Sequence, residues 1–122
     1  MRILYLGDGT SVHLRRWVAW FAARGHDVHL ITKACEPIPA VGITVAPLHE
    51  GAYRPRRHLR RAVADTVRSV RPDIVHAHYV QAWGHYAALA KVHPLVVSAW
   101  GSDIAKDPDE HWYARAAARR VV

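Results

Sequence analysis

The sequence predicts an α/β fold: a Rossmann-like, doubly wound parallel sheet in a single domain. Two observations support this prediction. Short apolar runs alternate with longer segments whose apolar residues recur at helical spacing, as in strands joined by crossover helices. Polar residues follow the apolar runs directly, and open α/β sheets bind ligands there, beyond the carboxyl ends of the strands. The length of 122 residues and the 51% hydrophobic content suit one buried core.

The first half of the chain is predicted to hold three strands and two helices. An apolar strand covers residues 2–6, and a helix follows over residues 11–24 because apolar residues such as Leu14 and Val18 recur at helical spacing. Gly25 is suited to end that helix, since glycine adopts the left-handed conformation of helix ends. The remaining elements are strands over residues 27–32 and 43–48, separated by a loop with two prolines, and a helix over residues 56–70.

The second half continues the alternation, with strands over residues 73–78 and 94–99 and helices over residues 82–91 and 109–119. Residues 116–122 have the pattern of a helix end followed by the start of a sixth strand, which predicts that the chain is the front part of a longer protein. The commonest doubly wound strand order, 3-2-1-4-5, brings the ends of strands one and four together.

Charge and cysteine content narrow the range of partners and compartments. Seventeen Lys and Arg residues against ten Asp and Glu residues give a net charge of +7, which favours an anionic partner. The single cysteine, Cys35, excludes an intrachain disulfide framework and fits a reducing cytoplasm. No apolar run approaches the roughly 20 residues that span a bilayer. We therefore expect a cytoplasmic protein.

The loop after the first strand is a candidate anion site, and it consists of Gly7, Asp8, Gly9, Thr10 and Ser11. Its Gly-x-Gly spacing resembles a dinucleotide fingerprint, but Val12 occupies the third glycine position and the second strand ends without the acid that binds a ribose. The glycines permit a tight turn that exposes backbone N–H groups at a helix start, which suits an anion. A turn without a ligand is the alternative.

The first turn of the following helix holds basic residues and no acid, although the helix dipole favours acids there. This conflict favours a bound anion. The alternative is that these side chains reach solvent or Asp8. The basic residues concerned are His13, Arg15 and Arg16.

Two histidines end the fourth strand. His76 and His78 are two residues apart and face the same side of the sheet. Zinc needs three or four ligands, and the sequence supplies no cysteine pair or His-Glu helical motif to complete a site, so we expect no metal. We predict that His76 is enclosed in the sheet while His78 points into the crevice, where it and two carboxylates could orient a hydroxyl nucleophile. A histidine bonded to a neighbouring loop is the alternative for His78.

An exposed basic face is predicted on the helix over residues 56–70, formed by Arg57, Arg60, Arg61 and Arg68. It is either a solvated surface or a surface that docks on anionic lipid at the inner face of a membrane. Nucleic acid is not an expected partner, because the five tryptophans are scattered rather than interleaved with the arginines.

Five segments resemble the amino-terminal domain of family 4 retaining glycosyltransferases: MRILYLGDG at residues 1–9, HxxRW at 13–17, ARGHDV at 23–28, RPDIVHAH at 71–78 and VSAWGSD at 97–103. The resemblance implies a GT-B fold, in which two Rossmann-like domains face each other across a cleft. It also implies sugar transfer from a nucleotide-sugar donor to an acceptor hydroxyl with retention and without a cofactor. The first domain mainly takes the acceptor, and the second, donor-binding domain is absent from this chain.

Carried to this sequence, the resemblance implies that the loop of residues 7–11 approaches the donor diphosphate and the transferred sugar. His78 is implied to contact the sugar or acceptor in the cleft. The acceptor-side residues are Tyr79, Trp100, Gly101, Ser102 and Asp103. We expect this chain alone to be inactive, because transfer needs both substrates held in reacting geometry. A stand-alone α/β module that binds an anion or nucleotide is the alternative function.

Overall fold

The fold is organised around one parallel sheet with helices on both faces. The computed structural model describes residues 1–46, 55–105 and 119. Its strands are β1 (Arg2–Leu6), β2 (Asp27–Thr32), β3 (Val41–Val45), β4 (Ile74–His78) and β5 (Leu95–Ser98). They form a five-stranded sheet in the order β3-β2-β1-β4-β5, and each neighbouring pair is parallel. The predicted fold class and strand order are therefore confirmed.

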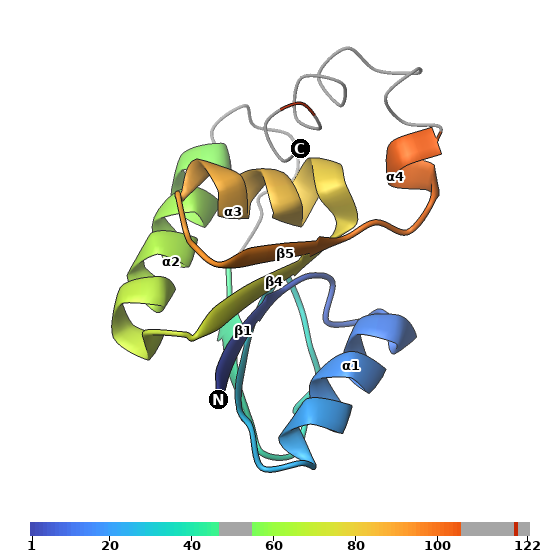
Figure 1. Cartoon of the computed structure of the whole chain (residues 1–122), viewed down its shortest axis with the longest axis vertical. Coiled ribbons are helices and arrows are strands. Elements are labelled where there is room, and N and C mark those ends of the chain that lie inside the picture. Colours follow the sequence, from blue (N-terminus) through green and yellow to red (C-terminus); the bar gives the residue numbers. More distant parts are fainter. Residues whose placement is uncertain (47–54, 106–118, 120–122) are drawn as a thin grey trace.

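The helices divide between the two faces of the sheet, with α1 on one side and α2 and α3 on the other (Figure 1). They are α1 (Val12–Ala22), α2 (Pro55–Val70), the π-helix η1 (Tyr79–Gly84), α3 (His85–Leu89) and α4 (Ser102–Ala105). Helix α1 begins beside the carboxyl end of β1 and ends near Gly25, whose φ of 78° is the left-handed conformation expected there.

Alternation along the strands supplies a separate core to each face. In β1, Leu4 and Leu6 join the cluster that Leu59 and Val63 of α2 complete, and each of these side chains is at most 1% exposed. Ile3 and Tyr5 point the other way, into a second cluster with Leu14 and Val18 of α1. The sheet is thus buried on both faces around β1, and this packing fixes the position of the carboxyl end of β1.

Three elements differ from the sequence prediction. Strand β3 begins at Val41, two residues early, and its Gly42 lies so close to His29 that a Cβ atom there would be 2.6 Å from the imidazole Nδ1. The predicted helix over residues 82–91 is replaced by η1 and the short α3, and α4 occupies a predicted loop. The predicted helix over residues 109–119 and the sixth strand lie outside the described residues, apart from Arg119.

Candidate functional site

A pocket of about 540 Å³ opens at the carboxyl ends of the strands. This volume is in the range of small-molecule sites. The lining side chains come from the ends of β1, β2, β4 and β5, from the start of α1 and from η1: Asp8, Ser11, His13, Leu14, Lys33, His78, Tyr79, Trp83 and Trp100. The site therefore occupies the end of the sheet that the sequence predicted.

His78 is the most unusual residue of the pocket. Its side chain is the last of β4 and is only 4% exposed, yet neither ring nitrogen has a hydrogen-bond partner. Aromatic rings surround it, with centroid distances of 5.9 Å to Trp17, 5.5 Å to Trp100 and 4.6 Å to His76. Buried polar groups are almost always paired in native structures, so an unpaired imidazole that lines a pocket points to a ligand.

The surroundings keep both histidines of β4 neutral at pH 7. Burial lowers the pKa of His78 to about 4, and a positive charge on His76 lowers it further. Burial also lowers the pKa of His76, whose Nε2 lies 2.8 Å from the Ser98 hydroxyl. His76 is thus enclosed within the sheet while His78 lines the pocket, as expected. A neutral His78 can donate one hydrogen bond and accept another.

The β1–α1 loop uses its backbone amides internally. The amide of Gly9 donates to the Thr32 hydroxyl at 2.7 Å, and those of Thr10 and Ser11 donate to Asp8 at 2.9 Å. The expectation that this loop exposes its amides to an anion is therefore wrong for these three groups. The Ser11 side chain makes no capping hydrogen bond to α1. The backbone amides of the first helical turn therefore donate no hydrogen bond to their N-cap side chain.

The two glycines of the loop allow close packing rather than amide exposure. A Cβ atom on Gly7 would lie 2.6 Å from Leu14 Cδ2 and 3.4 Å from His78 Cβ. A Cβ atom on Gly9 would lie 2.6 Å from Cys35 Cβ and 2.7 Å from the Ala34 carbonyl oxygen. Gly7 therefore brings the loop against the base of His78, and Gly9 brings it against the β2–β3 connection.

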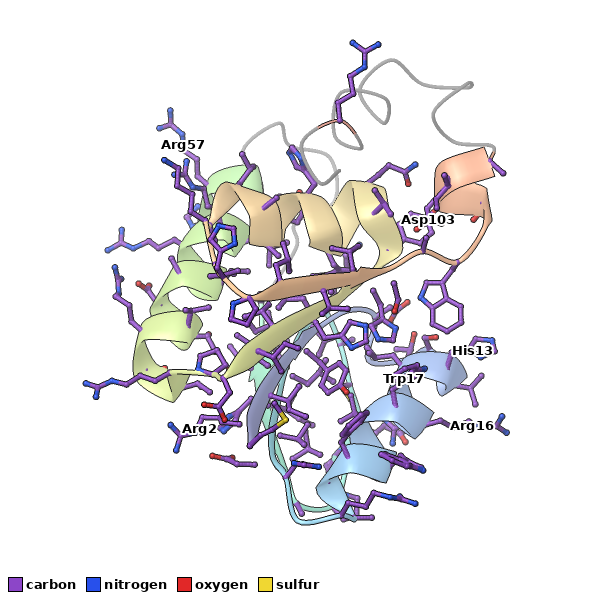
Figure 2. The ribbon with its side chains drawn as sticks, in the orientation of Figure 1. Arg2, His13, Arg16, Trp17, Arg57 and Asp103 are labelled. Carbon is purple, nitrogen blue, oxygen red and sulfur yellow. The ribbon has the colours of Figure 1, made fainter. Side chains whose placement is uncertain are left out.

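The basic residues of α1 take three different positions. Arg15 donates to the carbonyl oxygens of Glu36 at 3.1 Å and Gly9 at 3.4 Å. It therefore braces the loop, and neither of these partners is Asp8. Arg16 is exposed and lines a second pocket beside Trp17. His13 lies at the end of α1 nearest Asp103 (Figure 2), and it is the only one of the three that lines the candidate site.

The β5 end contributes a wall rather than a set of ligands. Trp100 is 43% exposed and lines the pocket, whereas Gly101 and Ser102 are exposed but do not line it. Asp103 is completely buried, and its two oxygens accept hydrogen bonds from backbone amides. The acceptor contact implied for Asp103 stays a prediction, and in this structure both carboxylate oxygens bond to the chain's own backbone.

Comparison with known families now adds to this geometry. A family model described as glycosyl transferase 4-like matches residues 2–121, nearly the whole chain. The chain belongs to the glycosyl transferase 4-like family. The match supports a transferase domain with the α/β Rossmann-like fold described above. In a comparison with curated proteins, none matches the chain.

Several pocket residues of this glycosyl transferase 4-like domain were not predicted as site residues. Lys33 follows β2 directly, and the strand-end rule that singled out His78 could have found it. Trp83 enters the pocket from η1, and no sequence periodicity signals a π-helix at that point. Leu14 was expected to be a core residue, and it is both core and pocket lining.

The predicted basic face lies on α2, away from the pocket. Figure 2 shows Arg57 on the opposite side of the molecule from His13. Arg57 and Arg60 are exposed, but Arg61 and Arg68 both pair with Asp65. The concentration of free positive charge on this face is therefore lower than the sequence alone indicated.

The described part of the chain shows neither a metal-binding cluster nor a membrane-spanning helix. Residues 1–46, 55–105 and 119 contain no group of three or more His, Cys, Asp or Glu side chains that could hold a metal ion. Over the same residues, no helix has the length and apolar character needed to cross a membrane.

Proposed function

We propose that this domain binds a nucleotide-sugar donor and an acceptor hydroxyl around His78, as the amino-terminal half of a GT-B glycosyltransferase that transfers the sugar with retention. The observation that carries the proposal is the buried His78 imidazole, which lines the strand-end pocket with both nitrogens unpaired. Membership of the glycosyl transferase 4-like family supplies the reaction class.

The chemistry of His78 suits a sugar hydroxyl. Leaving a buried polar atom unpaired costs about 1–3 kcal/mol, and a bound hydroxyl would recover this energy. A neutral imidazole matches a hydroxyl because each can donate one hydrogen bond and accept another. Trp100 and Trp17, whose rings contact His78, exclude water from the bond and thereby strengthen it.

The diphosphate of the donor requires positive charge and free amides. Lys33 is exposed at the end of β2 and lines the same pocket, and the uncapped first turn of α1 opens there through Ser11 and His13. A helix amino terminus attracts anions through its dipole and its unpaired N–H groups. We therefore assign the phosphates to the Lys33 side of the pocket and the sugar to the His78 side.

Turnover requires more than this half of the cleft. Sugar transfer needs donor and acceptor held in near-attack geometry, which a pocket open on one side does not provide. The isolated 122-residue chain is therefore expected to bind a donor weakly and to transfer nothing. In a protein that also contains the second domain, the His78→Ala variant is expected to lose most of its turnover.

A titration followed by NMR tests the proposal on the chain itself. UDP-glucose, GDP-mannose, UDP and inorganic phosphate are added separately to protein with labelled histidines. A nucleotide sugar should shift the His78 ring signals, and His78→Ala should weaken that binding about tenfold. Arg57→Ser, on the opposite side of the molecule, is the control and should bind normally. Equal binding of UDP and its sugar, without a shift at His78, would instead support an anion-binding module.

We further propose that the α2 face docks on anionic lipid through Arg57 and Arg60, the exposed arginines that no described acid pairs. This face lies away from the pocket, so docking would leave the site accessible (Figure 2). The proposal concerns a peripheral contact at the inner face of a membrane and is independent of the donor site.

A further inference from the structure

A single buried carboxylate connects the two loops that flank His78. Asp103 is 0% exposed, and its Oδ2 accepts a hydrogen bond from the Val80 amide at 2.9 Å. Its Oδ1 accepts one from the Trp100 amide at 2.8 Å. Val80 lies in η1, just after β4, whereas Trp100 lies just after β5. One side chain at the start of α4 therefore joins the segments that follow two neighbouring strands. Figure 2 shows Asp103 beside α4, at the end of the molecule that holds His13.

The backbone that Asp103 holds on the β4 side is strained. Tyr79 follows His78 directly and has a φ of 81°, a conformation that non-glycine residues rarely adopt. Such conformations persist only where neighbouring interactions enforce them, and they concentrate at functional sites. The charged hydrogen bond to Val80 acts on the next residue, and the Gln81 side chain donates to the Asp103 carbonyl oxygen. The chain is thus anchored immediately after His78.

On the β5 side, the anchor fixes a residue that packing does not hold. The side chain of Trp100 is 43% exposed, so burial alone does not determine its position. Its ring nevertheless lies 5.5 Å from the His78 ring and 5.1 Å from the His13 ring, as one wall of the pocket. The hydrogen bond between its amide and Asp103 restrains the backbone from which this wall extends.

We propose that Asp103 is a positioning residue, whose carboxylate holds the Tyr79–Val80 turn and Trp100 so that His78 stays shielded from water and lines the pocket. The carboxylate is completely buried, bonds to two backbone amides and does not line the pocket, so we assign it no direct contact with a substrate. Charge-assisted bonds of this kind are stronger than neutral ones, which suits a group that connects two loops. The inference rests on the proposed function only for its ligand-binding consequence.

The pH titration of His78, followed by NMR in the full 122-residue chain, tests this role directly. In the native protein the imidazole should titrate with a pKa of about 4. In Asp103→Ala, water should reach the ring and raise this pKa by about one unit or more. Asp103→Asn keeps one acceptor oxygen and should give an intermediate value. Nucleotide-sugar binding should be weaker in Asp103→Asn than in the native chain, and weaker still in Asp103→Ala.

Asp73→Ala is the matched control. The Asp73 carboxylate also accepts a hydrogen bond from a backbone amide, that of Arg2 at 2.6 Å, but at the opposite end of the sheet. It should lower stability without changing the titration of His78. A folded Asp103→Ala protein with an unchanged His78 pKa and unchanged Val80 and Trp100 amide signals would overturn the inference. If Asp103→Ala does not fold, the same comparison with Asp103→Asn decides.

The two proposals can fail separately. If the native chain binds no nucleotide sugar but the His78 titration still moves in the Asp103 variants, the proposed function is overturned and the positioning role stands. If donor binding is normal in both Asp103 variants and His78 titrates as in the native chain, the positioning role is overturned and the proposed function stands.

Discussion

At the scale of single residues, His78 carries a cost in stability that the proposed ligand would offset. Its ring is enclosed by aromatic side chains that offer no hydrogen bond, and both nitrogens remain unpaired. Functional sites commonly contain residues that a stability criterion alone would not select. His76, two residues earlier, shows the contrasting solution, since its Nε2 is paired with Ser98.

Replacing His78 by leucine should therefore stabilise the fold and abolish binding. The apolar side chain has a similar size and leaves no polar atom unpaired, so the free energy of unfolding should rise by about 1 kcal/mol. Urea denaturation at pH 7 measures this change. His76→Leu is the control, and it should lower the free energy of unfolding because the Ser98 hydroxyl loses its partner. A His78→Leu protein less stable than the native chain would contradict the prediction.

The depressed pKa values of these histidines predict acid sensitivity. Burial keeps His76 and His78 neutral in the folded state, with a pKa of about 4 for His78, whereas an unfolded histidine binds its proton below about pH 6.5. Between these values the unfolded state holds more protons, so the free energy of unfolding falls as the pH is lowered from 6.5 towards 4. For His78 the limiting slope is about 1.4 kcal/mol per pH unit, and His76 contributes in the same direction.

Urea denaturation at pH 7.5, 6.0 and 5.0 measures this slope. His78→Leu should show a shallower loss of stability than the native chain, because one of the two histidines no longer titrates. Tyr5 also contacts His78, but burial raises its pKa to about 12, so it stays neutral throughout this range. Equal slopes for the two proteins would show that His78 is hydrated in the folded state.

At the scale of elements, the β1–α1 loop is shaped by its contacts with the β2–β3 connection. The Gly9 amide is bonded to the Thr32 hydroxyl, and Arg15 bridges Gly9 and Glu36 by their carbonyl oxygens. These contacts fix the position of the loop that carries Asp8 and Ser11, which line the pocket. The loop is therefore a packed structure rather than an open cradle of amides.

The Gly9→Ala substitution should disturb this packing. The added methyl group would approach Cys35 Cβ and the Ala34 carbonyl oxygen to 2.6 and 2.7 Å, so the loop must shift. We expect a loss of about 1–3 kcal/mol in the free energy of unfolding, together with weaker nucleotide-sugar binding. Gly25→Ala is the control, because its φ of 78° strains the backbone while nothing lies within 4 Å of the added atom. It should lower stability but leave binding unchanged.

At the scale of the whole molecule, binding and surface charge are separated. The pocket lies at the carboxyl ends of the strands. Helix α2 covers one face of the sheet, and its Arg57 points away from the molecule (Figures 1 and 2). Within α2, Asp65 pairs with Arg61 and Arg68, whereas Arg57 and Arg60 are exposed and pair with no acid among the described residues.

Membrane docking predicts co-sedimentation with vesicles of phosphatidylglycerol and phosphatidylcholine at low salt, and its loss at high salt. Replacing Arg57 or Arg60 by serine should weaken vesicle binding by about 1 kcal/mol each. Arg61→Ser makes the same change in formal charge but removes an arginine already paired with Asp65, so its effect should be smaller. Equal effects at all three positions would indicate a response to net charge rather than a docking face, and absence of binding at low salt would exclude docking.

The sequence by itself determined the fold class, the strand order and the end of the sheet where the candidate pocket lies. These follow from the apolar periodicity of each segment and from the polar residues that interrupt it, such as His78 and Trp100. Such signals are local in sequence, and a parallel sheet has few ways to connect its strands. Boundaries were less accurate at β3, which begins at Val41 because Val41 and Gly42 pair with Val28 and His29 of β2, and which ends at Val45.

Only the tertiary structure showed which candidate site residues already have hydrogen-bond partners within the chain. Asp103 lies in a motif that implied an acceptor contact, but the amides of Val80 and Trp100 occupy its oxygens. Thr32 occupies the Gly9 amide in the same way. The Val80–Asp103 and Gly9–Thr32 partners lie 23 residues apart, and such pairs leave no trace in the local sequence pattern because their pairing depends on how strand ends meet. The residue types indicated which chemistry the pocket could hold. Which residues remain available to a ligand depended on the polar groups that already have partners in the folded chain.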